Sequence, residues 1–380
     1  MKKYAYVGAL GLLSIITTEF GVIGVLPQIA SHYQISIDQA SWLLSGFALV
    51  IALFGPFMTM LTAQIEKKTS MLLAIALFSI TSFCSVLLPS FGILLALRMI
   101  PALLQPVYIA NALAIAVNTS PEEQSSNRMS IVFSGITIAS FTTIPLATYW
   151  TNLVGLQAIF VIQGIISAVA FVAIYRVLPT VRGEKKNIKI NELNWLKKAP
   201  FIRSALVNLF VIAMWFSVYS YFADYLNKEK QLSGFQVSMM ILLFGIVGVV
   251  AMYFGGKLLK KGVVFSNVIY VVGAMGIATL LYLSANNLLL IIGLIALWSL
   301  FYTPVFLNVT AFLQRTTSIS FELGSSLSTS LGNLGIALGT FVGGKVITNY
   351  GIQHLPLVMF GFAGLSLILI FFVSRKNEIR

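Results

Sequence analysis

The sequence predicts an all-α membrane protein with twelve transmembrane helices in two six-helix bundles. Of its 380 residues, 58% are hydrophobic and only 9% are charged, whereas soluble globular domains carry about 25% charged residues. The apolar residues gather in runs of about 20, the length needed to cross the hydrocarbon core of a bilayer. The connections between these runs are short, so we expect no soluble domain of any size.

The predicted spans can be placed one after another along the chain. The first follows Lys2 and Lys3, and we interpret it as uncleaved because its apolar run is too long for a signal peptide and no A-x-A pattern follows it. Later spans end at polar connections, such as TAQIEKK after the second and GGKLLKK after the eighth. The twelve spans cover residues 5–26, 39–63, 69–88, 91–117, 127–149, 154–178, 204–226, 234–256, 263–284, 287–312, 322–347 and 352–374.

Basic residues lie mostly on one side of this topology. If the N-terminus is cytoplasmic, most of the 24 Lys and Arg residues fall in cytoplasmic loops and tails, and the outer loops contain only Lys228 and Lys230. Membrane proteins concentrate Lys and Arg in their cytoplasmic loops. We therefore expect a multi-pass cell (inner) membrane protein with both termini in the cytoplasm. The net charge of +13 then reflects topology, and we expect no nucleic-acid partner.

The longest polar stretch, residues 179–203, divides the chain into two sets of six spans. We predict an N-terminal bundle over 1–178, a cytoplasmic interdomain linker over 179–203 and a C-terminal bundle over 204–380. The linker mixes apolar residues such as Trp195 with basic ones. This pattern suits a segment lying on the membrane surface, and it is also compatible with a plain linker.

The two halves resemble each other weakly at a nearly constant offset. Three short segments in corresponding spans match: TAQIEKK (62–68) with GGKLLKK (255–261), PVYIAN (106–111) with PVFLNV (304–309), and TNLVGLQ (151–157) with TNYGIQ (348–353). Each match alone could arise by chance, but their shared offset indicates an internal duplication.

Two charged residues lie deep within predicted spans. Glu19 is the only charged residue between Ala5 and Ile29, and Arg98 lies in span 4. Each is about seven residues from the outer end of its span, which places them at matching depth at 1.5 Å per residue. Because intramembrane charges usually pair or face a water-filled cavity, we predict that both face a central cavity, near or touching each other. They form either a fixed ion pair between spans 1 and 4 or, as we favour, a proton site at Glu19 tuned by burial and by Arg98.

Other candidate site residues are less specific. Asp224, near the end of span 7, is either a further proton-coupling residue or a solvated span end. Uncharged polar and aromatic residues within spans favour a neutral or weakly cationic aromatic substrate, although such residues also bond or pack between helices. These candidate substrate contacts are Gln105, Tyr108, Asn111, Trp215, Tyr219, Phe222, Asn308 and Asn333.

Several motifs together resemble the major facilitator superfamily. They are TTEFGVIGVLPQIA (17–30), Gly55-Pro56 in span 2, Arg98 in span 4 and NLGIALG (333–339). Within that family the chain is most similar to bacterial drug:proton antiporters, a branch that includes purine-nucleoside, sugar and multidrug exporters. The resemblance covers nearly the whole chain. It implies the major facilitator fold, a role for Glu19 and Arg98 in proton coupling, and the proton gradient as energy source without a cofactor.

The resemblance leaves the direction of transport open. The segment Thr143-Ile144-Pro145-Leu146-Ala147 lacks both glycines of the G-x-P-x-G motif typical of exporters. The leading expectation is proton-coupled export of a drug, nucleobase, nucleoside or sugar by alternating access. An uncoupled facilitator, an importer and a lipid flippase are alternatives on the same fold.

A membrane enzyme is a distant alternative. Both histidines lie in outer loops, and the sequence has no H-E-x-x-H motif, no Walker A loop and no paired intramembrane carboxylates. With one cysteine, Cys84, we expect no cysteine metal site. The expected partners are a small-molecule substrate, protons and membrane lipids, and we expect a monomer.

Overall fold

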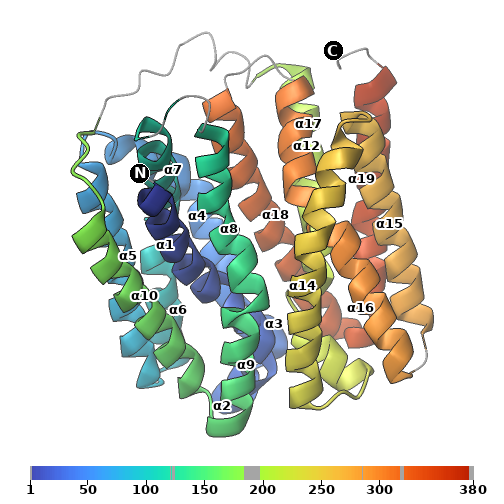
Figure 1. Ribbon diagram of the computed structural model, residues 1–380. Coiled ribbons are helices and arrows are strands. Elements are labelled where there is room, and N and C mark those ends of the chain that lie inside the picture. Colours follow the sequence, from blue (N-terminus) through green and yellow to red (C-terminus); the bar gives the residue numbers. More distant parts are fainter. Residues whose placement is uncertain are drawn as a thin grey trace. The chain divides into compact units, whose positions relative to one another are not determined.

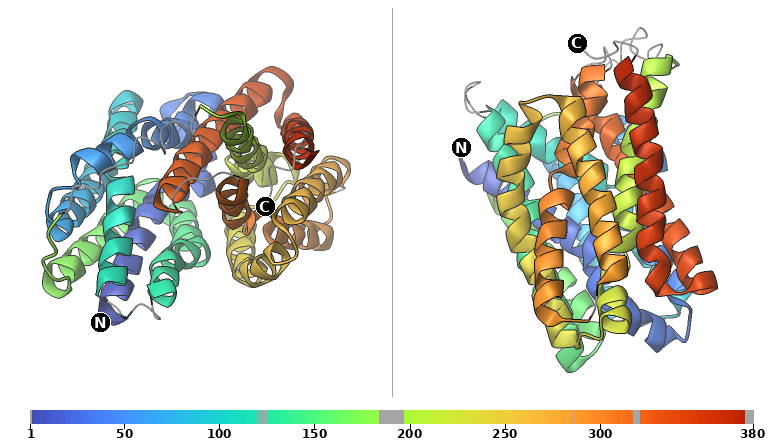
Figure 2. Two further views of the ribbon diagram at one scale, coloured as in Figure 1. Left: turned by 90° about the horizontal axis from the view of Figure 1, so that it is seen from above. Right: turned by 90° about the vertical axis from the view of Figure 1, so that its right-hand side faces the viewer.

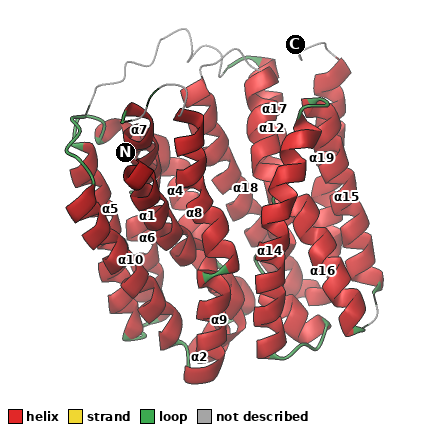
Figure 3. Cartoon of the chain, in the orientation of Figure 1, coloured by secondary structure: helices red, strands yellow, loops and turns green. Residues whose placement is uncertain are grey.

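The computed structural model describes residues 2–119, 121, 125–183, 197–284, 286–316 and 321–375, and these ranges contain helices and no strand (Figures 1 and 3). Twelve helical segments in them are long and apolar enough to cross a membrane. The predicted fold class and number of spans are thereby confirmed. Residues 184–196 of the predicted linker, including Trp195 of the predicted membrane-surface segment, lie outside the described residues, and the end of the linker from Ala199 belongs to the following helix.

The helices have the following bounds. They are α1 Lys2–Gly21, η1 Val22–Val25, α2 Leu26–Tyr33, α3 Ile37–Ala40, α4 Trp42–Leu61, α5 Lys67–Val86, α6 Phe91–Ala102, α7 Gln105–Asn118, α8 Ser125–Phe141, α9 Thr143–Val154, α10 Gln157–Val177, α12 Ala199–Tyr219, α13 Phe222–Asp224, η3 Tyr225–Glu229, α14 Gly234–Leu259, α15 Val263–Leu283, α16 Leu288–Tyr302, α17 Val305–Thr316, α18 Phe321–Tyr350, η4 Ile352–His354 and α19 Leu355–Arg375.

Several predicted spans are interrupted rather than continuous. The fourth breaks between α6 and α7, directly before Pro106, and the tenth breaks between α16 and α17 at Pro304. Proline lacks a backbone N–H and clashes with the carbonyl of residue i−4, so it breaks a helix. The two breaks fall at the matching PVYIAN and PVFLNV segments, which supports the internal repeat and places Gln105 at the first turn of α7.

The chain forms two compact units. The first consists of Met1–Gln34, Leu53–Lys186 and Gly234–Leu242, and the second of Ile35–Ala52, Asn187–Ser233 and Leu243–Arg380. Each unit is built mainly from one sequence half but takes one short segment from the other. The sequence-based limits of the two bundles stay a prediction.

Close packing of α12 on α18 organises the second unit, and the two helices lie side by side (Figure 2). Three glycines of α18, spaced four residues apart, meet the backbone of α12. A Cβ added at Gly335 would lie 2.6 Å from the Leu209 carbonyl oxygen, and one at Gly343 would lie 2.5 Å from that of Ser217. At Gly339 it would overlap the carbonyl of Ala213. Small residues let helix backbones approach closely within a membrane.

In the first unit, α1 is the mostly buried central span and packs on α8, α10 and α7. Gly135 of α8 has the same role as the α18 glycines, because a Cβ there would overlap the carbonyl of Ala9. Large apolar side chains are exposed on other spans, for example Leu53, Phe57 and Phe83. Soluble monomers rarely expose extensive apolar surface, so this pattern fits contact with lipid.

Candidate functional site

Glu19 lies in the last turn of α1 and is almost completely buried, with 2% of its surface exposed. The amide Nε2 of Gln105, in the first turn of α7, donates a hydrogen bond of 2.7 Å to Glu19 Oε2. The break in span 4 therefore supplies the carboxylate with a neutral donor. Gln105, which the sequence suggested as a substrate contact, is a direct partner of Glu19.

Arg98 of α6 contacts the same turn of α1 and is 3% exposed. Its Nη2 donates to the main-chain oxygens of Thr18, at 2.8 Å, and of Glu19, at 3.3 Å. The last four carbonyls of an α-helix have no intrahelical donor, and the guanidinium bonds two of them. It also lies close enough to act electrostatically on the Glu19 carboxylate. The structure thus brings Glu19 and Arg98 together, while their orientation toward a central cavity stays a prediction.

Neutral hydrogen bonds hold α1 in the first unit around this charged pair. Gln163 of α10 donates to the Thr17 carbonyl at 3.3 Å. The hydroxyl of Thr17 also bonds that of Thr143, and Ser14 bonds Ser167 at 2.8 Å. These bonds fix the end of α1 on which Glu19 lies.

An aromatic cluster lies within the second unit. Tyr219 stacks near Phe244 of α14 and Tyr302 of α16, with ring centroids 5.0 and 4.7 Å away. Trp215 is 5.7 Å from Tyr302, and Trp298 also packs in the cluster, 6.4 Å from Tyr219. Both indole Nε1 atoms are buried, and no acceptor within the described ranges bonds them. Phe222 packs on Trp298 at 5.3 Å, so the three aromatic residues that the sequence suggested in span 7 belong to one cluster.

Asp224 belongs to the second unit, beyond the end of the span Ala199–Tyr219. It is fully buried rather than solvated, and Lys228 Nζ lies 3.0 Å from its Oδ1. Burial raises the pKa of Asp224, and the positive charge of Lys228 opposes that increase. Glu19 and Arg98 lie in the first unit, so the three predicted proton-coupling residues do not form one cluster within a unit.

A Major Facilitator Superfamily model matches residues 8–321. The chain belongs to the major facilitator superfamily. This major facilitator is similar to the inner membrane transport protein YdhP of Escherichia coli (strain K12), with 26% identity over 97% of this chain and 95% of that protein. It is also similar to a probable sugar efflux transporter of Pasteurella multocida, with 22% identity over 95% of this chain and 89% of that protein.

Solved structures show the same fold. A bacterial homolog of the human lysosomal transporter Spinster, inward-facing and unoccupied, matches with a TM-score of 0.75 and 14% identity, covering 100% of this chain and 97% of that one. The nucleoside transporter NupG matches with a TM-score of 0.74 and 14% identity, and the match covers 99% of this chain and 100% of that one. This major facilitator is therefore a multi-pass inner membrane transporter and not an enzyme.

The remaining predicted substrate contacts of this major facilitator differ in their surroundings. The Tyr108 hydroxyl donates to the Gly8 carbonyl at 3.1 Å and is buried against α1. Asn308 bonds Pro304 O, Ser266 and Asn267, so it ties α17 to α15. Asn333 donates to Thr329 O at 3.0 Å, and Asn111 is partly exposed. Tyr108 and Asn308 have the helix-bonding role that the sequence left as an alternative.

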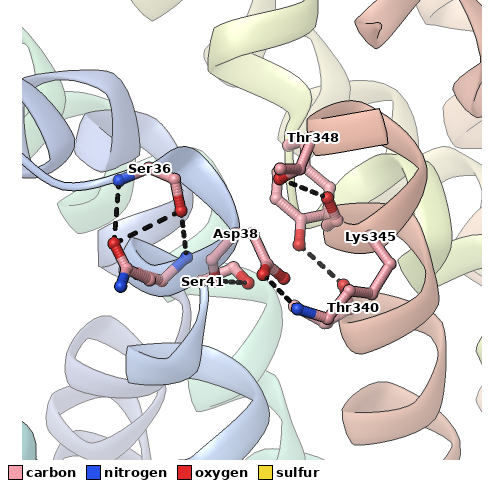
Figure 4. Close-up of polar contacts among 9 residues, drawn as sticks. Ser36, Asp38, Ser41, Thr340, Lys345 and Thr348 are labelled. Carbon is pink, nitrogen blue, oxygen red and sulfur yellow. Dashed lines mark hydrogen bonds and ion pairs between the residues drawn. The ribbon is translucent and has the colours of Figure 1, made fainter. Parts of the chain in front are cut away.

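A polar cluster at the start of α3 escaped the sequence analysis (Figure 4). Ser36 and Gln39 form a capping box at this helix start, and the buried Asp38 between them pairs with Lys345 of α18 at 2.8 Å. Next to it, the Tyr221 hydroxyl donates to Thr340 O at 2.6 Å. Asp38 and Lys345 each lie near the end of a predicted span, where charges are common. No sequence signal links these two residues, because they are far apart along the chain.

Proposed function

We propose that this major facilitator is a proton-coupled secondary active transporter that exports a small organic molecule by alternating access. Glu19 binds and releases the proton, Arg98 holds the turn on which Glu19 lies, and the proton gradient supplies the energy. One elementary charge crossing 100 mV gains about 2.3 kcal/mol, before any pH gradient is added. Similarity to probable sugar efflux transporters supports the outward direction.

The buried Glu19 carboxylate carries this proposal. A charged side chain in the middle of a membrane helix costs roughly 2.5–3.5 kcal/mol even on the translocon scale. Among the described residues, Gln105 and the nearby Arg98 offset that cost. Protonation removes the negative charge and with it the attraction to Arg98. A change in the surroundings of Glu19 during transport would therefore change its affinity for a proton, which is what coupling requires.

The aromatic cluster supports a flat substrate of neutral or weakly cationic character. Aromatic faces bind flat rings and cations, and a buried N–H without an acceptor is energetically unfavourable. A ligand with a ring nitrogen or carbonyl would satisfy the Trp215 or Trp298 indole. Nucleobase-like and drug-like molecules have these features.

The test begins with a ligand screen. Thermal stabilisation of the purified protein is measured with purines, sugars, cationic dyes and antibiotics, because a bound ligand stabilises by RT ln(1 + [L]/Kd). The best ligand is then tested in proteoliposomes with an imposed pH gradient. We expect uphill transport by the unmodified protein and none by Glu19→Gln, which retains binding and exchange. Uphill transport by Glu19→Gln would refute the assignment of the proton site.

The same assay separates the alternatives. Transport that ignores both the pH gradient and Glu19→Gln would identify an uncoupled facilitator. Accumulation of substrate on the acidic side, from which the protons flow, would support antiport, and accumulation on the alkaline side, which the protons enter, would identify symport.

A further inference from the structure

Gln105 offers two hydrogen-bonding groups to Glu19, and only one of them is used. Its Nε2 donates to Glu19 Oε2, while its own Oε1 is buried and accepts no hydrogen bond within the described part of the chain. The residue as a whole is 4% exposed. Buried polar atoms are nearly always hydrogen-bonded, so this unused acceptor next to a carboxylate requires an explanation.

We infer that Gln105 stabilises both protonation states of Glu19, an inference that rests on the proposed role of Glu19 as the proton site. A carboxylate can only accept hydrogen bonds, whereas a carboxylic acid also has one O–H to donate. The amide matches both forms: its N–H donates to the carboxylate, and its carbonyl accepts the O–H of the acid. The terminal torsion of glutamine is broad and roughly two-fold, so a rotation of the amide presents either group.

The proton balance of this step is simple. A proton arrives from water, one O–H bond forms on the Glu19 carboxyl, and the charge of the group changes from −1 to zero. No other bond forms or breaks. The new O–H then needs an acceptor inside a buried site, and Gln105 Oε1 is a buried acceptor already positioned on α7.

The two partners of Glu19 respond differently to the proton. Arg98 is the charged group that acts on the Glu19 carboxylate, and this attraction ends when the carboxylate is neutralised. Its bonds to the main-chain oxygens of Thr18 and Glu19 do not depend on protonation. Gln105 keeps α7 bonded to the Glu19 side chain in both states. Gln105 is thus a positioning residue that holds the carboxyl in place while its charge changes.

Infrared difference spectroscopy between low and high pH tests this inference on the full chain in lipid, without a ligand. The carboxyl C=O band of protonated Glu19 is assigned by its loss in Glu19→Gln. Gln105→Met removes both amide groups at similar volume. We expect the carboxyl band to move to higher frequency in this variant, because the O–H has lost its acceptor. The matched control is Gln163→Met, whose amide bonds the Thr17 main chain and no carboxylate.

The pH midpoint of that band gives a second readout. A charge-assisted hydrogen bond is about twice as strong as a neutral one. Gln105→Met therefore removes more hydrogen-bond stabilisation from the Glu19 carboxylate than from the protonated acid. The midpoint should therefore shift to higher pH, by roughly 0.5–1 unit. Gln163→Met should leave both the band and the midpoint unchanged.

A labelled sample tests the inference without relying on the folding of Gln105→Met. The glutamines are labelled with ¹³C at the side-chain amide carbonyl. Protonation of Glu19 should then shift one side-chain amide band, and this band should be missing in Gln105→Asn. An unchanged carboxyl band and midpoint in Gln105→Met, or equal shifts in Gln163→Met, would overturn the inference. If Glu19→Gln retains every pH-dependent carboxyl band, the proposed function fails at Glu19 itself, whatever Gln105 does.

Discussion

Replacing Gly339 by alanine should separate α18 from α12 and destabilise the second unit. A Cβ at this position would overlap the main-chain carbonyl of Ala213. A backbone atom cannot rotate away as the end of a flexible side chain can, so one of the two helices has to move. Among the described residues, α12 and α18 form the most extensive contact between two helices, and the movement would affect this contact along its length.

The expected cost follows from overpacking. Adding a methyl group to a well-packed interface typically costs about 1–3 kcal/mol. Gly332 of the same helix provides the control, because its added Cβ would meet only Asn208 and Ile212, at 3.9 and 4.0 Å. Alanine in a helix is more favourable than glycine by roughly 0.5–1 kcal/mol. Gly332→Ala should therefore be neutral or stabilising, so of the two variants only Gly339→Ala should lose stability.

Thermal unfolding of both purified variants, followed by tryptophan fluorescence in one detergent, measures the difference. We expect Gly339→Ala to unfold at a lower temperature than the unmodified protein and Gly332→Ala at an equal or higher one. Gly335→Ala and Gly343→Ala should resemble Gly339→Ala. If Gly339→Ala and Gly332→Ala unfold at the same temperature, the close approach of α12 and α18 is wrong.

Three further predictions concern the polar groups of the second unit. Lys345→Met should lower the free energy of unfolding by about 1–3 kcal/mol, because it leaves the buried Asp38 carboxylate without its partner. In a double-mutant cycle of thermal unfolding, Asp38→Asn should restore part of that loss. Equal losses from Lys345→Met with and without Asp38 would contradict the pairing. Burial raises the pKa of Asp224 in the folded protein. The contribution of this carboxyl to the free energy of unfolding is therefore complete below its pKa in the unfolded chain, and it is lost as pH rises through its pKa in the folded protein. The melting temperature of the unmodified protein relative to Asp224→Asn should therefore fall as pH rises above the unfolded pKa of about 4, and a constant difference would refute this. Trp298→Phe should weaken binding of an acceptor-bearing ligand about ten-fold, or about 1.4 kcal/mol, as measured by thermal stabilisation, and unchanged affinity would remove the indole from the substrate site.

Much of the fold follows from local sequence features. Runs of apolar residues predict the twelve spans because the bilayer sets the length of a crossing helix. The matching depths of Glu19 and Arg98 follow from the constant rise of the helix, and the structure places these residues in contact through Glu19's main chain. The breaks before Pro106 and at Pro304 were not predicted, although the prolines themselves were the signal.

The partners of individual side chains could not be predicted in the same way. The role of Gln105 as a substrate contact stays a prediction, and the sequence did not indicate that it bonds Glu19, because the break in span 4 directs the first turn of α7 toward α1. Tyr108 is buried because Gly11 leaves space for its ring, which a Cβ at that glycine would overlap. These outcomes depend on how closely particular helices approach, and the sequence pattern of one helix does not contain that distance.

The sequence by itself determined the twelve-helix class, the internal repeat and the presence of a charged pair within the membrane. These depend on hydrophobicity, helix rise and charge, which are properties of short segments. Only the tertiary structure decided that Gln105 is the donor to Glu19, that Asp38 pairs with Lys345, and that glycines of α18 meet the backbone of α12. Each of these contacts joins segments distant in sequence, and the packing of whole helices sets its geometry.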